Sequence, residues 1–220
     1  MKILCISDHI DPLVYSQSIK SRFKDVDLII SSGDLPLRYY DFIVSNLNKP
    51  LVFVFGNHNL KRIHFYKPQY RSQLGALYDL ASFHGVGAIY LGGRVKMVKG
   101  LILAGLGGSM WYNGGLNQYT EIGMFFQIVR LLPKLLFHRI FHGRFLDILV
   151  THSPPYGIHD LPDRCHTGFK VFLWFMKVFK PRYLIHGHVH LYDKNAERSE
   201  KYLDTEVINA YNHCLINMEV

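Results

Sequence analysis

Short runs of apolar residues recur along the chain, separated by polar and turn-forming residues. In the first half these runs alternate with stretches whose apolar residues are spaced for one face of a helix, such as residues 37–47. The apolar runs predict β-strands at residues 3–6, 28–31, 51–55, 88–91, 94–98, 101–104, 148–151 and 183–186. Residues 202–208 and 213–218 predict a closing hairpin. This order favours a layered α/β protein with mixed sheets.

Turn residues refine this pattern between residues 88 and 104. Gly92-Gly93 and Lys99-Gly100 separate three short strands and predict that tight turns join all three. No internal repeat, low-complexity tract or linker interrupts the 220 residues. We therefore expect a single domain that spans residues 1–220.

Charge narrows the class of partner. Lys and Arg total 25 and Asp and Glu total 17, which gives a net charge of +8. Such a surface favours anionic partners, namely phosphorylated substrates, nucleic acid or an acidic membrane face. The basic residues are dispersed, and the sequence has no motif of an RNA-binding, zinc-finger or helix-turn-helix module. We therefore do not expect nucleic acid as a specific partner.

The cysteines and the lengths of the apolar runs indicate in which cellular compartment the protein is expected. Cys5, Cys165 and Cys214 are odd in number and far apart, which argues against a disulfide framework or a thiolate zinc site. The N-terminal apolar run is too short for a signal peptide, and no window is long enough to span a bilayer. We expect a cytoplasmic protein that is soluble or peripheral to a membrane.

Metal-competent side chains follow five of the predicted strands. In an open α/β sheet, ligands bind beyond the carboxyl ends of the strands. Each fragment alone is typical of an ordinary turn, but five in succession favour one shared site. The fragments are Ser7-Asp8-His9, Gly33-Asp34, Gly56-Asn57-His58-Asn59, Thr151-His152-Ser153 and His186-Gly187-His188-Val189-His190. Carboxylate, amide oxygen and imidazole together suit Mn²⁺, Fe or Zn²⁺. A shared carboxylate can hold two ions about 3.5–4 Å apart for in-line phosphoryl transfer.

The order of these motifs resembles the calcineurin-like metallophosphoesterase superfamily. Its usual pattern is Asp-x-His, Gly-Asp, Gly-Asn-His, a later His, and then Gly-His-x-His; the resemblance here runs from Asp8 to His190. It implies a four-layer sandwich in which helices flank two mixed β-sheets. It also implies a metal-dependent hydrolase of phosphomonoesters or phosphodiesters, with metal-bound hydroxide as the attacking group. Two divalent ions are expected, with Mn²⁺ favoured and Fe or Zn²⁺ as alternatives.

The resemblance also implies a role for each matching residue. Asp34 would bridge both ions. Asp8 and His190 would hold the first ion, and the second ion would be held by Asn57, His152 and His188. His58 would lie beside the phosphate, where it would protonate the leaving oxygen or stabilise the transition state.

The first motif departs from the family pattern. The His expected two residues after Asp8 is replaced by Ile10, and a His stands at position 9 instead. Neighbours in an extended segment point in opposite directions, so His9 does not simply replace the missing ligand. Asp11 could reach the first ion, or it could cap a turn before Pro12, and water could fill the gap. Without a substitute, the first site is expected to be weakly occupied.

Residues 123–145 are the least ordinary segment. Large apolar residues alternate there with Arg130, Lys134, Arg139 and Arg144. Ordinary helices that pack on the sheet would explain this pattern. A basic amphipathic surface for peripheral membrane contact is the sharper hypothesis, and it suits a phosphorylated small-molecule or lipid substrate.

A different class of function also stays open, because some superfamily members serve as scaffolds for protein assembly. The presence of His58 and of the later His ligands favours an enzyme.

Overall fold

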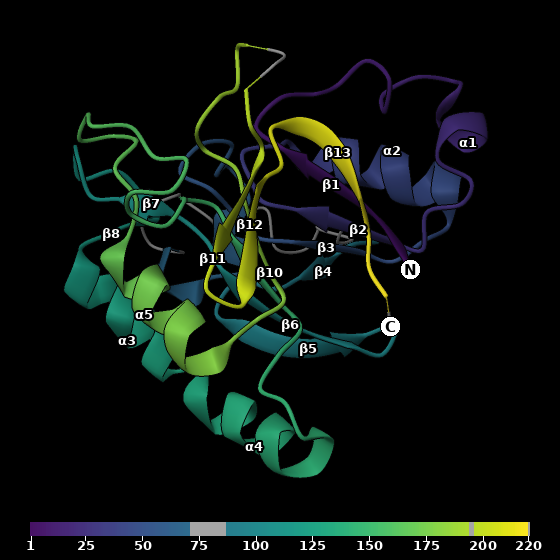
Figure 1. Cartoon of the computed structure of the whole chain (residues 1–220). Helices are drawn as coiled ribbons and strands as arrows, with labels where there is room; N and C mark the ends of the chain where they lie inside the picture. The colour runs from purple at the N-terminus through teal and green to yellow at the C-terminus, as the bar shows by residue number, and fades with distance from the viewer. Residues whose placement is uncertain (71–86, 194–195, 220) are drawn as a thin grey trace.

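The computed structural model describes residues 1–70, 87–193 and 196–219. These residues form two large mixed β-sheets stacked face to face, with helices on both outer faces (Figure 1). The sequence prediction of a four-layer sandwich is thereby confirmed.

The first sheet, sheet A, contains the N-terminal strands. Its order is β13-β1-β2-β3-β4, in which β1 to β4 are parallel and β13 is antiparallel to β1. The strands are β1 (Lys2–Ser7), β2 (Leu28–Ser31), β3 (Leu51–Phe53), β4 (Ile89–Tyr90) and β13 (Asn212–Asn217). Its outer face is covered by α1 (Ile19–Arg22) and α2 (Leu37–Leu47). The short 3₁₀ helices η1 (Ile63–Phe65) and η2 (Pro68–Tyr70) follow β3.

The second sheet, sheet B, has the order β11-β12-β10-β9-β6-β5, and its four central strands are parallel. The strands are β5 (Arg94–Val98), β6 (Leu101–Leu106), β9 (Ile148–Thr151), β10 (Tyr183–His186), β11 (Ser199–Tyr202) and β12 (Thr205–Asn209). The outer helices are α3 (Glu121–Val129), α4 (Leu132–His142) and α5 (Lys170–Phe179). The pair β7 (Ser109–Met110) and β8 (Gln118–Tyr119) lies beside the entry to α3.

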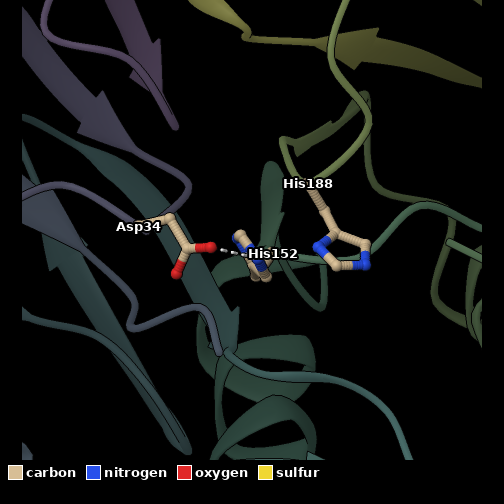
Figure 2. A group of neighbouring side chains, drawn as sticks. All are labelled: Asp34, His152 and His188. Carbon is tan, nitrogen blue, oxygen red and sulfur yellow. Dashed lines mark ion pairs between the residues drawn. The ribbon is translucent and has the colours of Figure 1, made fainter. Parts of the chain in front are cut away.

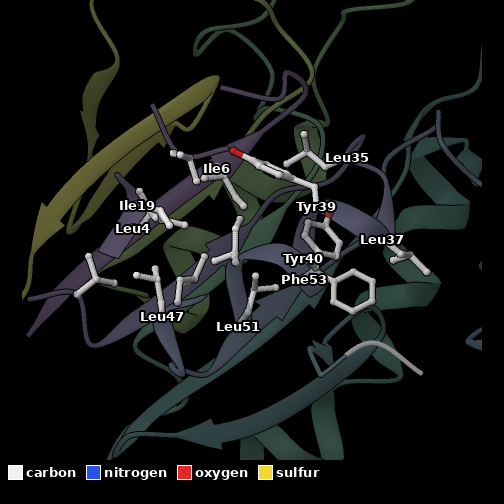
Figure 3. Close-up of a cluster of buried hydrophobic side chains, with 14 of the residues drawn as sticks. Leu4, Ile6, Ile19, Leu35, Leu37, Tyr39, Tyr40, Leu47, Leu51 and Phe53 are labelled. Atoms are coloured by element: carbon white, nitrogen blue, oxygen red, sulfur yellow. The ribbon is translucent and has the colours of Figure 1, made fainter. Parts of the chain in front are cut away.

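The continuous apolar run of β1 is explained by burial on both faces of its sheet. Successive side chains of a strand point to opposite faces. Leu4 and Ile6 therefore pack under α2 in the cluster drawn in Figure 3, whereas Ile3 and Cys5 pack between the two sheets. Such two-sided burial is typical of parallel sheets covered by helices.

The predicted closing hairpin of residues 202–208 and 213–218 is wrong. The hairpin is instead formed by β11 and β12, and β13 crosses to sheet A, where it pairs with β1. A two-residue hairpin needs turn residues that accept positive φ, and Ala210-Tyr211 between β12 and β13 is not such a pair.

Of the two tight connections predicted between residues 88 and 104, one is a hairpin, namely the turn between β5 and β6. Gly92-Gly93 carries the chain from sheet A into sheet B.

Candidate metal centre

The carboxyl ends of strands from both sheets meet at one edge of the sandwich. Asp34 follows β2, His152 follows β9 and His188 follows β10. Each offers one ligand atom, and these atoms all lie within 4.8 Å of one another. Figure 2 shows His152 between the carboxylate of Asp34 and the ring of His188. Residues far apart in the sequence are thus brought together by the parallel strands.

The backbone turns sharply where these side chains leave their strands. Asp8, Asp34 and His188 have φ values of 64°, 57° and 69°, in the left-handed region that residues other than glycine rarely adopt. Such a conformation costs of order 1–3 kcal/mol and tends to occur at functional sites. The glycines are needed for close approach, because a Cβ on Gly56 would overlap the Asp34 carboxylate and one on Gly187 would overlap Ser7 and Asp8.

Hydrogen bonds fix which nitrogen of each buried histidine faces the site. Nδ1–H of His152 donates to the carbonyl oxygen of Ser32 at 2.8 Å. Its Nε2 therefore faces Asn57 Oδ1 at 3.0 Å and Asp34 Oδ2 at 3.3 Å. Nε2–H of His188 donates to the carbonyl oxygen of Cys165 at 2.8 Å, which leaves Nδ1 as its free ligand atom. Such partners orient the histidine ligands of metal sites.

The charges in the site are strongly coupled. Burial favours a low pKa for His152, but the neighbouring carboxylates of Asp34 and Asp8 outweigh it and raise the pKa to about 9. Burial opposes ionisation of Asp34, yet His152 holds the pKa of that carboxyl below its usual value. Burial, followed by the charge of His152, lowers the pKa of His188 to about 3, so this ring is neutral. In the metal-free protein a proton on His152 thus occupies the place that a cation would take.

Asp8 follows β1, and His190 lies four residues after the end of β10. Oδ2 of Asp8 accepts the backbone N–H of His188 at 2.9 Å, whereas its buried Oδ1 has no hydrogen-bond partner among the described residues. Nε2 of His190 lies 4.0 Å from that Oδ1. The His190 ring is partly exposed and stacks on Tyr211 with ring centroids 4.8 Å apart. A buried carboxylate oxygen without a partner is costly, and a cation would satisfy it. The residues present therefore fit divalent metal ions.

The three residues that follow Asp8 lie in three different environments. His9 is exposed, and Ile10 packs against the apolar cluster under α2. Both oxygens of Asp11 have partners: Oδ1 accepts the backbone N–H of Leu13 at 2.8 Å, and Oδ2 accepts Nδ1–H of His213 at 2.6 Å. These contacts favour the turn-capping interpretation of Asp11 over its use as a metal ligand.

His58 lies at the mouth of the site. Its backbone N–H donates to Asp34 Oδ1 at 2.8 Å, and the residue is exposed. Asn59 fixes the same turn from the other side, because its Nδ2 donates to the carbonyl oxygen of Asp34 at 2.7 Å. The structure thus anchors the His58 backbone on the proposed bridging residue and leaves its side chain accessible to a substrate.

Several residues that support the site were missed from the sequence. Tyr112 Oη accepts a hydrogen bond from Asn57 Nδ2 at 3.3 Å. Asn117 Nδ2 donates to the carbonyl oxygens of Phe55 and Gly56, and Lys67 Nζ donates to Asn117 Oδ1 at 2.6 Å. Burial, with a smaller effect of Arg130, lowers the pKa of Lys67 to about 8. These residues lie in loops without a recognisable motif, so no sequence signal could have identified them.

A second group of metal-capable side chains lies nearby, formed by Asp163, Cys165 and His166. Its side chains are exposed or half-buried, and Asp163 Oδ1 already accepts the backbone N–H groups of Cys165 and His166. This carboxylate therefore stabilises the turn formed by residues 163–166. The contribution of the loop to the metal centre is the Cys165 carbonyl that orients His188.

Comparison with known proteins gives a family match and structural similarities. A family model described as calcineurin-like phosphoesterase matches residues 1–192. No curated protein matches the sequence. One solved crystal structure is similar with a TM-score of 0.63 and 14% identity, over 98% of this chain and 94% of the other. The structure of TT1561 from Thermus thermophilus is similar with a TM-score of 0.60 and 14% identity, over 96% and 89% of the two chains. At this identity the structural similarities bear on the fold alone.

Proposed function

This chain belongs to the calcineurin-like phosphoesterase family, and from that premise we propose that it is a metal-dependent hydrolase of phosphomonoesters or phosphodiesters. The observation that carries the proposal is the meeting of Asp34, His152 and His188, whose ligand atoms lie within 4.8 Å of one another. The buried Oδ1 of Asp8, which has no hydrogen-bond partner in the part of the chain that the structure describes, supports it independently, since this oxygen needs a cation or a proton.

Two divalent ions would be held by residues of both sheets. Asn57, His152 and His188 would hold one ion, Asp8 and His190 the other, and Asp34 would be shared. Mn²⁺ is the favoured ion, with Fe and Zn²⁺ as alternatives, because the ligands are oxygens and imidazole nitrogens without thiolate. When bound, the ions would supply positive charge to the phosphate and lower the pKa of a bound water.

His58 would act on the leaving group. Its backbone is tied to Asp34 and its side chain is exposed, so its imidazole can reach a phosphate bound at the centre. There it would donate a proton to the leaving oxygen. A positioned general acid of this kind contributes about 10²–10⁴-fold to turnover.

The residues that line a cleft beside His58 favour the proposal that the substrate is anionic. Its volume is about 670 Å³, and it is lined by Pro36, Leu37, Arg38, Asp41, Asn59, Leu60, Lys61 and Arg62. Its walls are the segments that directly follow Asp34 and His58. Three basic residues against one acidic residue favour a substrate that carries negative charge beyond the reacting phosphate. A phosphorylated small molecule or a phosphorylated lipid would meet that requirement.

The experiment is a comparison of wild type and His58→Ala after metal removal and reconstitution with Mn²⁺. Hydrolysis of p-nitrophenyl phosphate and bis-p-nitrophenyl phosphate separates monoesterase from diesterase activity. We expect His58→Ala to lower turnover about 10²–10⁴-fold with metal content intact. His142→Ala on α4, also exposed, is the matched control and should not change turnover. Equal turnover of wild type and His58→Ala would refute the role of His58. A wild type that binds metal but hydrolyses neither ester would favour the scaffold function.

A further inference from the structure

Helix α4 presents its larger apolar side chains to solvent. Leu136, Phe137, Ile140 and Phe141 are spaced so that they share one side of the helix, and each is at least half exposed, from 50% for Phe137 to 75% for Ile140. On the opposite side of α4, Leu135 and His138 are buried and Leu132 is partly buried against the core. This arrangement is the reverse of a helix that packs its apolar face on a core.

The exposed apolar side chains continue onto the two neighbouring helices. Phe125 of α3 contacts Trp174 of α5, with ring centroids 5.8 Å apart. Val178 of α5 lines a cleft together with Arg139, Arg144 and Phe145 at the end of α4. We call this region the helical surface; its exposed large apolar residues are Ile122, Phe125, Phe126, Leu136, Phe137, Ile140, Phe141, Trp174 and Val178. An apolar patch of this kind on a soluble domain typically marks an interaction site.

Basic residues predominate around the helical surface. Residues 122–146 contain four Lys and Arg residues and no Asp or Glu, and residues 168–182 also contain four basic and no acidic residues. The acidic side chains at its margins in the described chain already have partners: Glu121 at the start of α3 accepts the backbone N–H groups of Lys170 and Val171, Asp147 pairs with Arg144, and Asp204 pairs with Lys180. Lys134 and Arg139 flank the exposed apolar side of α4. The surface is therefore apolar in its centre and basic at its edges.

We propose that the helical surface docks the protein onto an anionic lipid membrane. Apolar side chains of an interfacial helix enter the headgroup region, and flanking Lys and Arg residues pair with acidic headgroups. None of the helices in the described ranges is long and apolar enough to cross a membrane, so the contact would be peripheral. A second copy of this chain is disfavoured as the occupant, because like charges would face each other.

The test is co-sedimentation of the metal-loaded protein with lipid vesicles. We expect binding to vesicles of phosphatidylcholine mixed with phosphatidylglycerol, weaker binding at high salt, and little binding to phosphatidylcholine alone. Ile140→Gln/Phe141→Gln should weaken binding at least ~10-fold because two apolar anchors are lost. Lys134→Gln/Arg139→Gln should weaken it about 5-fold per charge.

The matched control is Leu13→Gln/Leu215→Gln, which removes two exposed leucines from the sheet A half of the molecule. It should bind vesicles as the wild type does, and circular dichroism should show all variants folded. Absence of binding to acidic vesicles would overturn the proposal, as would equal loss in the control. Self-association that Ile140→Gln/Phe141→Gln abolishes, without vesicle binding, would also overturn it and assign the surface to a second copy. The readout is binding, so it does not depend on the proposed hydrolysis.

Discussion

The two halves of the proposed metal centre differ in how well their proposed ligands are held. In the proposed inner half-site, made of Asn57, His152 and His188 with Asp34, both rings are oriented by carbonyl oxygens and both are buried. In the outer half-site, Asp8 has an oxygen without a partner among the described residues, and His190 is partly exposed. Metal affinity depends on such supporting groups as well as on the ligands. We therefore expect the inner ion to bind first and the outer ion to determine how activity depends on metal concentration.

The difference arises from the number of ligands that each half is expected to have. Asp34 and Asn57 follow strands of sheet A and His152 and His188 follow strands of sheet B, so four residues would hold the inner ion. The outer half-site also draws on both sheets, through Asp8 after β1 and His190 after β10 with Asp34, but Ile10 stands where a further histidine is expected and is partly buried against the apolar cluster under α2. Four variants would break or sharpen this comparison.

The largest effect is expected at Asp34, which both halves share. Asp34→Asn keeps the shape but removes the charge that binds both ions, so elemental analysis should show loss of metal. Turnover should fall about 10³–10⁴-fold, since metal ions stabilise the transition state of phosphate hydrolysis by several kcal/mol. Asp204→Asn, at a surface ion pair, should retain both metal and activity. Full metal content in Asp34→Asn would contradict the shared role.

The next effect concerns Lys67, whose hydrogen bond through Asn117 supports only the inner half-site. Burial lowers its pKa from 10.5 to about 8, so between these pH values the unfolded chain binds more protons than the folded protein. The unfolding free energy should therefore rise with pH across this window, by about 3 kcal/mol. Lys67→Met should remove this rise in urea titrations of the metal-free protein, and Lys96→Met, an exposed control, should keep it. An identical pH dependence in Lys67→Met and the wild type would show that its ammonium is not desolvated.

Ile10→His tests the outer half-site by restoring the family's ligand. The Mn²⁺ concentration that gives half-maximal activity should fall about 10-fold or more, because an imidazole would replace water. Titration calorimetry should assign the gain to the weaker of the two ions. Ile10→Leu, which keeps an apolar side chain, should leave the metal dependence unchanged. No response to Ile10→His would mean that this position does not face the outer ion.

Asp11→Ala should have the smallest effect on metal binding, namely none. Its carboxylate pairs with His213 and caps a turn, so its loss should instead lower the unfolding free energy by about 1–3 kcal/mol. Thermal unfolding of Asp11→Ala, His213→Ala and the double variant should show non-additive losses. Weaker binding of the outer ion in Asp11→Ala would establish Asp11 as a substitute ligand.

The sequence allowed the layered fold and the meeting of Asp34, His152 and His188 to be predicted, because both depend on local patterns. Two-sided burial makes each parallel strand a short apolar run, and the chemistry-bearing residues follow directly after it, as Asp34 follows β2. The structure brings Asp34, His152 and His188 together, while the assignment of ions to ligands stays a prediction.

Pairings between distant segments could not be predicted in this way. Cys5 and Cys214 lie directly opposite each other on β1 and β13, although the sequence suggested only that the cysteines were far apart. The same limitation produced the wrong closing hairpin and concealed the contact of Lys67 with Asn117. The spacing of apolar residues shows which face of a strand is buried, but this spacing does not show which other strand pairs with that strand.

The pairing of β1 with β13 has a consequence for biosynthesis. The ammonium of Met1 donates to the carbonyl oxygen of Met218, 217 positions away, so sheet A includes strands from both extremes of the described chain. During synthesis from the N-terminus, β1 and Asp8 emerge long before β13 can cover their edge. An unpaired strand edge is prone to wrong association, and contacts of such long range form slowly. The nascent chain therefore passes through a vulnerable interval, during which a chaperone or early metal binding would raise the yield of native protein.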